Sequence, residues 1–243
     1  MIDVSSVSFT YAGAGGPVLD GVSLHVERGA LVCLCGANGS GKSTLLSLLA
    51  GLFSPVQGTV RVGGHSSPGA ERALRAQSAL VLQDADLQII GSTVEEDLLL
   101  TTGTAGAAVA AARGMAERFG LGGHWNSPVQ TLSYGQKRKL CLAAAALRAP
   151  QLLLLDEPFS GLDYPAMCEL RGLLRHNAAE GLTQIVSVHD VEPLADMADT
   201  MAVLHKGRLA LDGAPEAVLE HAEAYGLRVP CSWRTNRTIA PWA

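Results

Sequence analysis

The chain has 243 residues, of which 48% are hydrophobic and 17% are charged, so its composition excludes a disordered protein. The net charge is −5 and Lys and Arg form no cluster, which gives no support for a nucleic-acid partner. The most apolar stretches, at residues 140–147 and 152–155, are too short to span a membrane, and residues 1–4 lack a signal-peptide pattern. Any membrane role is therefore expected to depend on a partner.

The five cysteines offer no metal site or disulfide framework. Cys33 and Cys35 lie together in an apolar run, but no second pair exists to complete a zinc site. We expect buried free thiols in a reducing cytoplasm.

The first part of the chain predicts short strands, one glycine-rich loop and one helix. The strands are expected at residues 2–9, 22–26, 30–35, 59–62 and 79–82, with a turn at 13–17. The run at 30–35 is continuously apolar, as in a strand buried on both faces. The helix should extend from about residue 42 to residue 49 and end at Gly51.

Residues 93–147 have a different character, because strand patterns disappear and Ala-rich helical stretches replace them. Thr93 is a good helix cap, and the acidic residues Glu95, Glu96 and Asp97 suit a helix N-terminus. This part predicts a helical lobe inserted into an α/β core.

The last part predicts four buried strands, at residues 152–155, 184–188, 201–204 and 208–211, with helices between the first three. This alternation favours a mostly parallel sheet. Residues from about 228 lack periodicity and predict a tail. We expect one domain over 1–225, with a core of 1–85 and 150–225 and a lobe at about 86–149, followed by a tail at 226–243.

A phosphate-binding loop is predicted at residues 36–43, which fit the pattern G-x-x-x-x-G-K-[ST] between a predicted strand and a helix. Glycines allow backbone N–H groups to surround phosphate oxygens, and the helix N-terminus adds positive potential. Lys42 would reach the β- and γ-phosphates of ATP, and the Ser43 hydroxyl would bind Mg²⁺. The nucleotide-binding residues expected here are Gly36, Asn38, Gly39, Ser40, Gly41, Lys42, Ser43 and Thr44.

Two carboxylates follow the apolar residues 152–155, at the end of a predicted strand where α/β sheets bind ligands. Asp156 is expected to hold Mg²⁺, and Glu157 is expected to polarise the attacking water as general base. No Asn-Lys-x-Asp pattern for reading guanine is present. The two motifs together predict a nucleotide-hydrolysing enzyme.

Residues 132–136 (LSYGQ) resemble the LSGGQ signature of the ATP-binding cassette (ABC) ATPases. Further motifs of that family have counterparts in order: an aromatic residue for adenine, a Q-loop glutamine, a D-loop and a switch histidine. These are Tyr11, Gln83, the D-loop at residues 160–163 with Asp163, and His189. The resemblance covers about residues 2–221 and implies a phosphate-loop ABC cassette: a RecA-like parallel core, an antiparallel β subdomain and an inserted helical signature lobe.

The resemblance also implies a head-to-tail dimer with a second ABC ATPase subunit, identical or similar. Ser133, Gly135 and Gln136 would contact the ATP bound by the opposite subunit, and Asp163 would lie at the dimer seam. Gln83 would contact Mg²⁺ and the attacking water, and His189 the γ-phosphate. The family usually has glycine where this chain has Tyr134, and a positive φ there would strain the contact.

Residues 83–97 resemble the ATPases of energy-coupling-factor (ECF) importers, which take up vitamins or nickel and cobalt ions. This implies a transmembrane coupling subunit, a substrate-binding membrane subunit, and a place on the cytoplasmic face of the membrane. We further expect the acidic residues at 84, 86 and 95–97 to form a groove that pairs with an Arg on a membrane subunit.

Three alternatives stay open from the sequence. The chain could serve a conventional ABC importer or exporter, or act as an ABC protein without a membrane partner. A stand-alone nucleotide kinase would leave the signature at 132–136 and His189 without a role.

Overall fold

The computed structural model describes residues 1–242 and divides them into two compact units. The first unit joins residues 1–80 to residues 151–242, and the second is Val81–Pro150. The assignment of one ATPase domain over residues 1–225 remains a prediction. No helix in residues 1–242 is both long and apolar enough to cross a bilayer.

The central sheet has six strands in the order β10-β9-β3-β8-β7-β6. β3 pairs in parallel with β8 and β9, β7 pairs in parallel with β8, and β10 is antiparallel to β9 at one edge. The strands are β3 (Leu31–Cys35), β6 (Ser78–Val81), β7 (Leu152–Leu155), β8 (Thr183–Val188), β9 (Thr200–His205) and β10 (Arg208–Gly213). All side chains of β3, β7 and β8 are buried, which explains the apolar composition of β3 and β7; β8 also buries three polar side chains.

A second, antiparallel sheet has the order β2-β1-β4-β5. Its strands are β1 (Ile2–Phe9), β2 (Leu19–Val26), β4 (Gln57–Val62) and β5 (His65–Ser67). Alternate side chains of β2 are buried, so one face of this sheet joins the core. The main core cluster combines these residues with apolar side chains of α1 (Lys42–Leu49) and of the central sheet.

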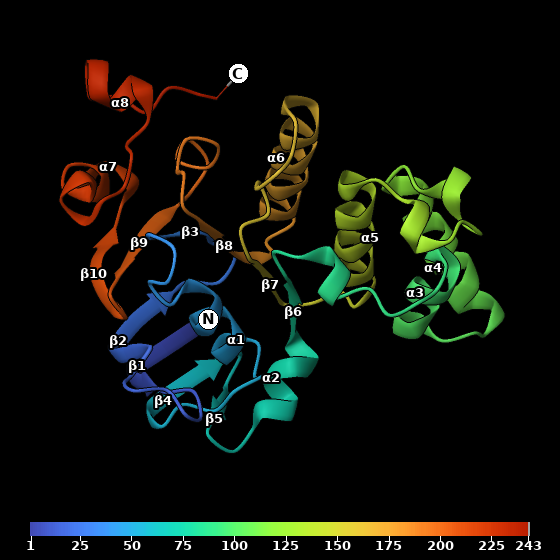
Figure 1. Ribbon diagram of the computed structural model, residues 1–243, viewed down its shortest axis with the longest axis horizontal. Coiled ribbons are helices and arrows are strands. Elements are labelled where there is room, and N and C mark those ends of the chain that lie inside the picture. Colours follow the sequence, from blue (N-terminus) through green and yellow to red (C-terminus); the bar gives the residue numbers. More distant parts are fainter. Residues whose placement is uncertain (243) are drawn as a thin grey trace. The chain divides into compact units, whose positions relative to one another are not determined.

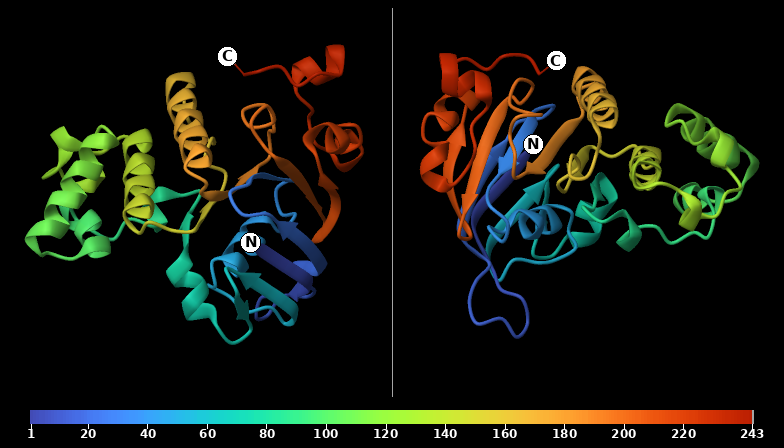
Figure 2. Two further views of the ribbon diagram at one scale, coloured as in Figure 1. Left: turned by 180° about the vertical axis from the view of Figure 1, so that it is seen from behind. Right: turned by 45° about the horizontal axis from the view of Figure 1, so that its top comes forward.

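Short and long helices surround the sheets of the first unit (Figures 1 and 2). α6 (Tyr164–Ala179) contacts β8, and α7 (Pro215–Leu219) contacts β9 and β10. The others are α2 (Glu71–Gln77), the 3-10 helix η4 (Ala222–Tyr225) and α8 (Cys231–Asn236).

The second unit is helical, as predicted. Its helices are η1 (Ala85–Leu87), α3 (Val94–Thr102), α4 (Gly106–Arg118), η2 (Gly122–His124), η3 (Val129–Thr131) and α5 (Tyr134–Leu147). The Thr93 hydroxyl accepts a hydrogen bond from the Glu96 N–H and caps α3 as expected. A separate core of Leu98, Ala112, Ala116, Leu140 and their neighbours joins α3, α4 and α5, because small alanines let the helices approach closely. The predicted fold class is thus confirmed.

Three expectations about the last part of the chain were wrong. Residues 189–199 form turns rather than a helix, in a segment where Pro193 supplies no N–H donor. β10 is only half-buried, because it is an edge strand. The expected tail contains α8, whose buried Trp233 packs this segment onto the first unit. Residue 243 of the tail lies outside the described residues.

The expectation for the cysteines is only partly correct. Cys33, Cys35 and Cys141 are buried free thiols, whereas Cys168 and Cys231 are exposed. The exposed pair lie on α6 and α8, outside the apolar strands on which the expectation rested.

Candidate functional site

The phosphate loop connects β3 to α1 and follows the carboxyl end of β3, an inner strand of the central sheet. A side chain at Gly36 would place its Cβ 2.3 Å from the Leu204 carbonyl oxygen, so the loop can follow this path only with glycine. Lys42 is buried, and its Nζ donates to the carbonyl oxygens of Gly36 at 2.8 Å and Ala37 at 3.3 Å. The ammonium group is therefore held inside the loop.

The start of α1 is suited to an anion. Gly41 occupies the N-cap position without a side-chain cap, and the first turn contains no acidic residue. The buried Ser40 hydroxyl has no hydrogen-bond partner in the part of the chain that the structure describes. Backbone N–H groups at a helix N-terminus and an unsatisfied hydroxyl both match phosphate oxygens, so this loop fits a nucleotide.

Two carboxylates stand at the end of β7. The Ser187 hydroxyl on β8 donates to Asp156 Oδ1 at 2.6 Å and accepts from the Glu157 N–H at 2.9 Å. Glu157 has a φ of 44°, a left-handed conformation that costs a residue with a side chain about 1–3 kcal/mol. The parallel pairing of β7 and β8 places the three residues side by side.

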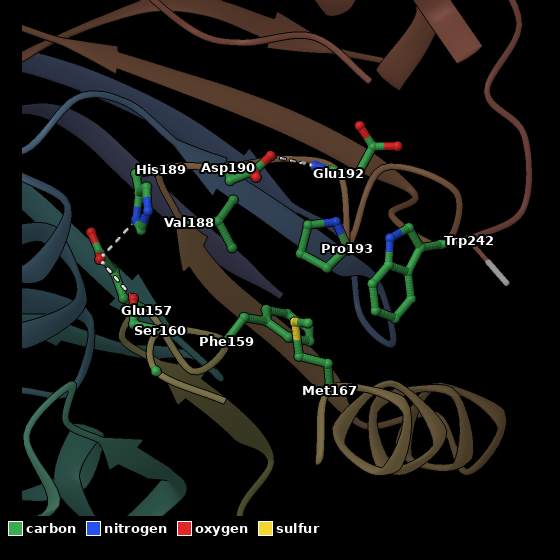
Figure 3. Close-up of a pocket in the computed structure, with 11 residues that line it drawn as sticks. Glu157, Phe159, Ser160, Met167, Val188, His189, Asp190, Glu192, Pro193 and Trp242 are labelled. Carbon is green, nitrogen blue, oxygen red and sulfur yellow. Dashed lines mark hydrogen bonds and ion pairs between the residues drawn. The ribbon is translucent and has the colours of Figure 1, made fainter. Parts of the chain in front are cut away.

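The Glu157 side chain is the centre of this group (Figure 3). Its carboxylate lies 3.2 Å from Lys42 Nζ and 3.0 Å from His189 Nδ1, and it accepts from the Ser160 hydroxyl at 3.3 Å. Burial acts to raise the pKa of Glu157, but the hydrogen bonds and charge of Lys42, with the contact to His189, hold it below the usual value. Glu157 is therefore a carboxylate at neutral pH, the form a general base needs.

Ser187 is a site residue that sequence reasoning missed. The available signal was a serine within the apolar residues 185–188, two positions before His189, because a buried hydroxyl requires a partner. Its two hydrogen bonds fix both carboxylate-bearing residues at once.

We expect Ser187→Ala to lower the turnover number for ATP about tenfold with little change in KM, because Asp156 and the Glu157 N–H lose a shared partner. Thr183→Val is the matched control, since it removes a buried hydroxyl at the other end of β8. Each change should cost about 1–3 kcal/mol of stability. Equal turnover in the two variants would contradict a positioning role for Ser187.

The first unit also contains Tyr11 and Asp163. The Tyr11 hydroxyl lies 3.0 Å from Thr44 Oγ1, and its half-exposed ring packs edge-on against Phe9 and Phe53. Asp163 is the N-cap of α6, where its carboxylate accepts from the Ala166 N–H at 3.0 Å. The exposed ring is available for stacking, whereas the roles of both residues toward nucleotide and partner stay predictions.

The predicted signature residues lie in the second unit, at the start of α5. Ser133 and Gln136 form a capping box: the Ser133 hydroxyl accepts from the Gln136 N–H at 3.3 Å, and the Gln136 side chain accepts from the Ser133 N–H at 2.8 Å. The hydroxyl proton of Ser133 is not used in this box and can be donated to a ligand. A Cβ at Gly135 would meet nothing within 4 Å, so packing within the chain does not demand glycine there.

Tyr134 does not strain the signature. It is the first residue of α5 and does not have a positive φ, so the condition for strain is not met. Its hydroxyl donates to the Gln83 carbonyl oxygen at 3.5 Å, and the guanidinium of Arg138 donates to the same oxygen at 2.6 Å while lying over the Tyr134 ring. The backbone of the expected Q-loop residue is therefore tied to the signature helix.

The expected acidic groove stays a prediction: Asp97 is buried, whereas Asp84, Asp86 and Glu96 are exposed and also make contacts within the second unit. Asp84 accepts from the Asp86 N–H, and Asp86 pairs with Lys137 at 2.6 Å. Asp97 is buried and accepts from two backbone N–H groups, and Glu96 accepts from the Ser92 N–H. The same segment also exposes apolar side chains: Leu87 is 77% and Ile90 is 81% exposed.

Residues 19–160 match the family model described as ABC transporter. The cobalt import ATP-binding protein CbiO of Rhodobacter capsulatus is 38% identical over 93% of this chain and 85% of its own length. The energy-coupling factor transporter ATP-binding protein EcfA of Methanothermobacter thermautotrophicus is 32% identical over 95% of this chain and 77% of its own length. The hemin import ATP-binding protein HmuV of Rhodopseudomonas palustris is 35% identical over 91% of this chain and 85% of its own length.

A solved structure agrees with these similarities. CbiO1 of Clostridium perfringens, described as part of the ABC transporter complex cbiONQ, superposes with a TM-score of 0.78 at 27% identity and covers 92% of each chain. The matched family model includes the phosphate loop, the signature and the two carboxylates, and ATPases of this family hydrolyse ATP to drive transport. The chain is therefore an ATP-binding, ATP-hydrolysing protein of the ABC transporter family.

Proposed function

We propose that this chain is the ATPase subunit of an ECF-type importer of a vitamin or of cobalt or nickel ions. The observation that carries the proposal is similarity along nearly the whole chain to ATPases named for cobalt import and for an energy-coupling factor. We further propose that two copies act together, because one chain contains both the phosphate loop and the signature that each complete site needs. The chain would lie on the cytoplasmic face of the membrane as a peripheral protein, held there by its membrane partners.

ATP would bind in the phosphate loop with its adenine against the Tyr11 ring. Lys42 would exchange the carbonyl oxygens of Gly36 and Ala37, and its contact with Glu157, for the β- and γ-phosphate oxygens. Ser40 would gain the partner that it lacks in the described chain. This exchange explains how a buried lysine stays satisfied before the nucleotide arrives.

Ser43, Asp156 and Gln83 are proposed to hold Mg²⁺ with the phosphates, and their hydroxyl, carboxylate and amide oxygens are the ligands that this cation accepts. The Ser187 hydrogen bond occupies Asp156 Oδ1 and leaves Oδ2 for the cation. In residues 1–242 no cluster of three His, Cys, Asp or Glu forms a ready-made metal site, which suits a cation held largely by phosphate. When bound, Mg²⁺ neutralises charge on the transferred phosphoryl group.

Hydrolysis would proceed with Glu157 as general base. Glu157 takes a proton from water, the water oxygen bonds to the γ-phosphorus, and the bond to the leaving oxygen of ADP breaks. On ATP binding, His189 would exchange its contact with the Glu157 carboxylate for a hydrogen bond donated to the γ-phosphate. Release of Lys42 from Glu157 on ATP binding would free the carboxylate for water.

The signature of one copy would complete the site of the other. The free hydroxyl proton of Ser133, the Gly135 N–H and the N-terminus of α5 would meet the γ-phosphate bound across the dimer. ATP would thus join the two copies, and hydrolysis would release them.

Leu87 and Ile90 are proposed to receive an apolar segment of the membrane coupling subunit, since both side chains are largely exposed among the exposed carboxylates Asp84, Asp86 and Glu96. The similarity to HmuV supports a second candidate, the ATPase of a conventional importer with paired permease domains. Both candidates share the ATPase chemistry and differ in the membrane partners.

Mass spectrometry of proteins that co-purify with the tagged chain from gently solubilised native membranes separates the two candidates. We expect a coupling membrane protein and a small substrate-binding membrane protein, whose ligand would identify the solute. Ile90→Asp should lose both proteins while the purified chain still binds ATP, whereas Leu100→Asp, an exposed leucine on α3, is the control. A paired permease, or no membrane protein at all, would contradict the ECF proposal.

A further inference from the structure

A buried ion pair joins α6 to the segment that follows His189. Arg171 is 2% exposed, and its two terminal nitrogens donate to the two oxygens of Asp196 at 2.8 and 2.7 Å, a bidentate pair. Arg171 also donates to the Pro193 carbonyl oxygen, and Arg175 adds a second contact to Asp196 at 3.2 Å. Residues 189–199 contain no helix, and this pair is a contact that holds them to α6.

Trp242 closes the same pair from outside. Its backbone N–H donates to Asp196 Oδ2 at 3.1 Å, its backbone carbonyl oxygen accepts from Arg171 at 3.4 Å, and its ring centre lies 5.0 Å from the guanidinium carbon. Its ring also packs against Tyr164, the first residue of α6. Burial acts to raise the pKa of Asp196, but Arg171 and the Trp242 N–H hold it below the usual value, so the pair is charged at neutral pH.

The cavity beside the catalytic carboxylate reaches this point. It has a volume of about 420 Å³, and its lining extends from Glu157, Ser160 and His189 at one end to Trp242 at the other (Figure 3). Phe159 and Met167 lie between them. Trp242 therefore forms a wall of the space that opens onto the proposed general base.

The two elements that the pair joins each begin at a residue with a predicted catalytic or dimer role. Asp163, in the D-loop, is the N-cap of α6, and Arg171 lies on this helix about two turns later. The segment with Pro193 and Asp196 begins at His189, the ring in contact with Glu157. A shift between α6 and this segment would change where His189 stands relative to Glu157.

We propose that Arg171, Asp196 and Trp242 form a clasp that positions His189 and the D-loop for ATP hydrolysis. Trp242 is the member of the clasp that the test below replaces. Trp242 contacts Arg171, Asp196 and Tyr164, none of which is a predicted nucleotide-binding residue, so its loss is expected to act on turnover rather than on nucleotide affinity. The inference rests on the proposed roles of Glu157 and His189.

The test is the steady-state kinetics of Trp242→Ala, Trp242→Phe and the control Arg234→Ala, measured on the full chain. Arg234→Ala breaks the exposed pair between α8 and Glu223. Trp242→Ala should lower the turnover number about tenfold with an unchanged KM for ATP. Trp242→Phe, which keeps a ring over the guanidinium, should recover most of the turnover.

Unchanged turnover in Trp242→Ala would overturn the clasp, as would equal losses in the Ala and Phe variants. A rise in KM without a fall in turnover would also overturn it, since that places Trp242 in nucleotide binding. Glu157→Gln, measured in parallel, separates the two levels of the account: if that variant hydrolyses ATP normally, the proposed site fails, and if it is inactive while Trp242→Ala is normal, only the clasp fails.

Discussion

Glu157→Gln is expected to lower the turnover number for ATP by a factor of about 10² to 10⁴. Glutamine has the same shape, so it can still accept from Ser160, but its amide cannot take a proton from water. It also removes the negative charge that Lys42 contacts before the nucleotide arrives, so the phosphates compete with one partner fewer for the ammonium group. ATP affinity should therefore stay the same or increase.

The variant should also retain ATP in a dimer that cannot open. Light scattering after gel filtration would report the increase in mass with ATP, and a colorimetric phosphate assay would report turnover. Glu180→Gln, at the C-cap of α6, is the matched control and should hydrolyse ATP as the unmodified protein does. Unchanged phosphate release by Glu157→Gln would remove Glu157 from the role of base.

Lys42→Met should abolish tight ATP binding. Lys42 is buried in the phosphate loop, and on ATP binding its ammonium group would make charge-assisted hydrogen bonds to the β- and γ-phosphates. Such bonds contribute about 1.5–3 kcal/mol each, so the loss of two should weaken binding by a factor of about 10² or more. Methionine keeps the length and apolar body of the side chain, so the loop itself should still form.

Isothermal titration calorimetry with ATP and Mg²⁺ measures this loss directly. Lys139→Met removes the same charge from α5 in the second unit and serves as control, with an expected affinity within about twofold of the unmodified chain. Lys42→Met with normal affinity would mean that the nucleotide does not bind in this loop.

The strands and the phosphate loop could be predicted because local sequence determines them. The run Leu31–Cys35 is buried on both faces, and Gly39 and Gly41 in the loop that follows it adopt a positive φ, a local property that favours glycine. The cap at Thr93 is equally local, since its partner Glu96 lies three residues away. Such features need no knowledge of how distant parts of the chain meet.

Features that depend on partners far along the chain could not be predicted. Ser187 acquires its role only when β8 pairs with β7 and brings the hydroxyl to Asp156 and Glu157. Trp242 acquires its role only through the pair formed by Arg171 and Asp196. The sequence contains the polar residue in a buried strand and the isolated aromatic, but not the contact that each makes.

The acidic segment shows how a charge count can mislead. Five carboxylates between residues 84 and 97 looked like a surface for a basic partner. Four of them make contacts within the second unit: Asp84, Glu96 and Asp97 accept backbone hydrogen bonds, and Asp86 pairs with Lys137. Asp97 is also buried. Asp84, Asp86 and Glu96 are still exposed, and so are Leu87 and Ile90, so the segment offers both charged and apolar side chains to a membrane partner.

The claim that two copies complete each site is tested most directly by mixing two inactive variants. Lys42→Met cannot bind ATP but keeps its signature. Ser133→Asp binds ATP and keeps the cap of α5, because aspartate is a good N-cap, but it places a negative charge against the γ-phosphate of the partner. Each variant alone should show almost no hydrolysis.

When the two are mixed in equal amounts, random pairing gives dimers in which the ATP held by Ser133→Asp meets the intact signature of Lys42→Met. We predict that phosphate release recovers to about a quarter of the unmodified rate, the share of sites that are then complete. A mixture no more active than the sum of its parts would contradict the account.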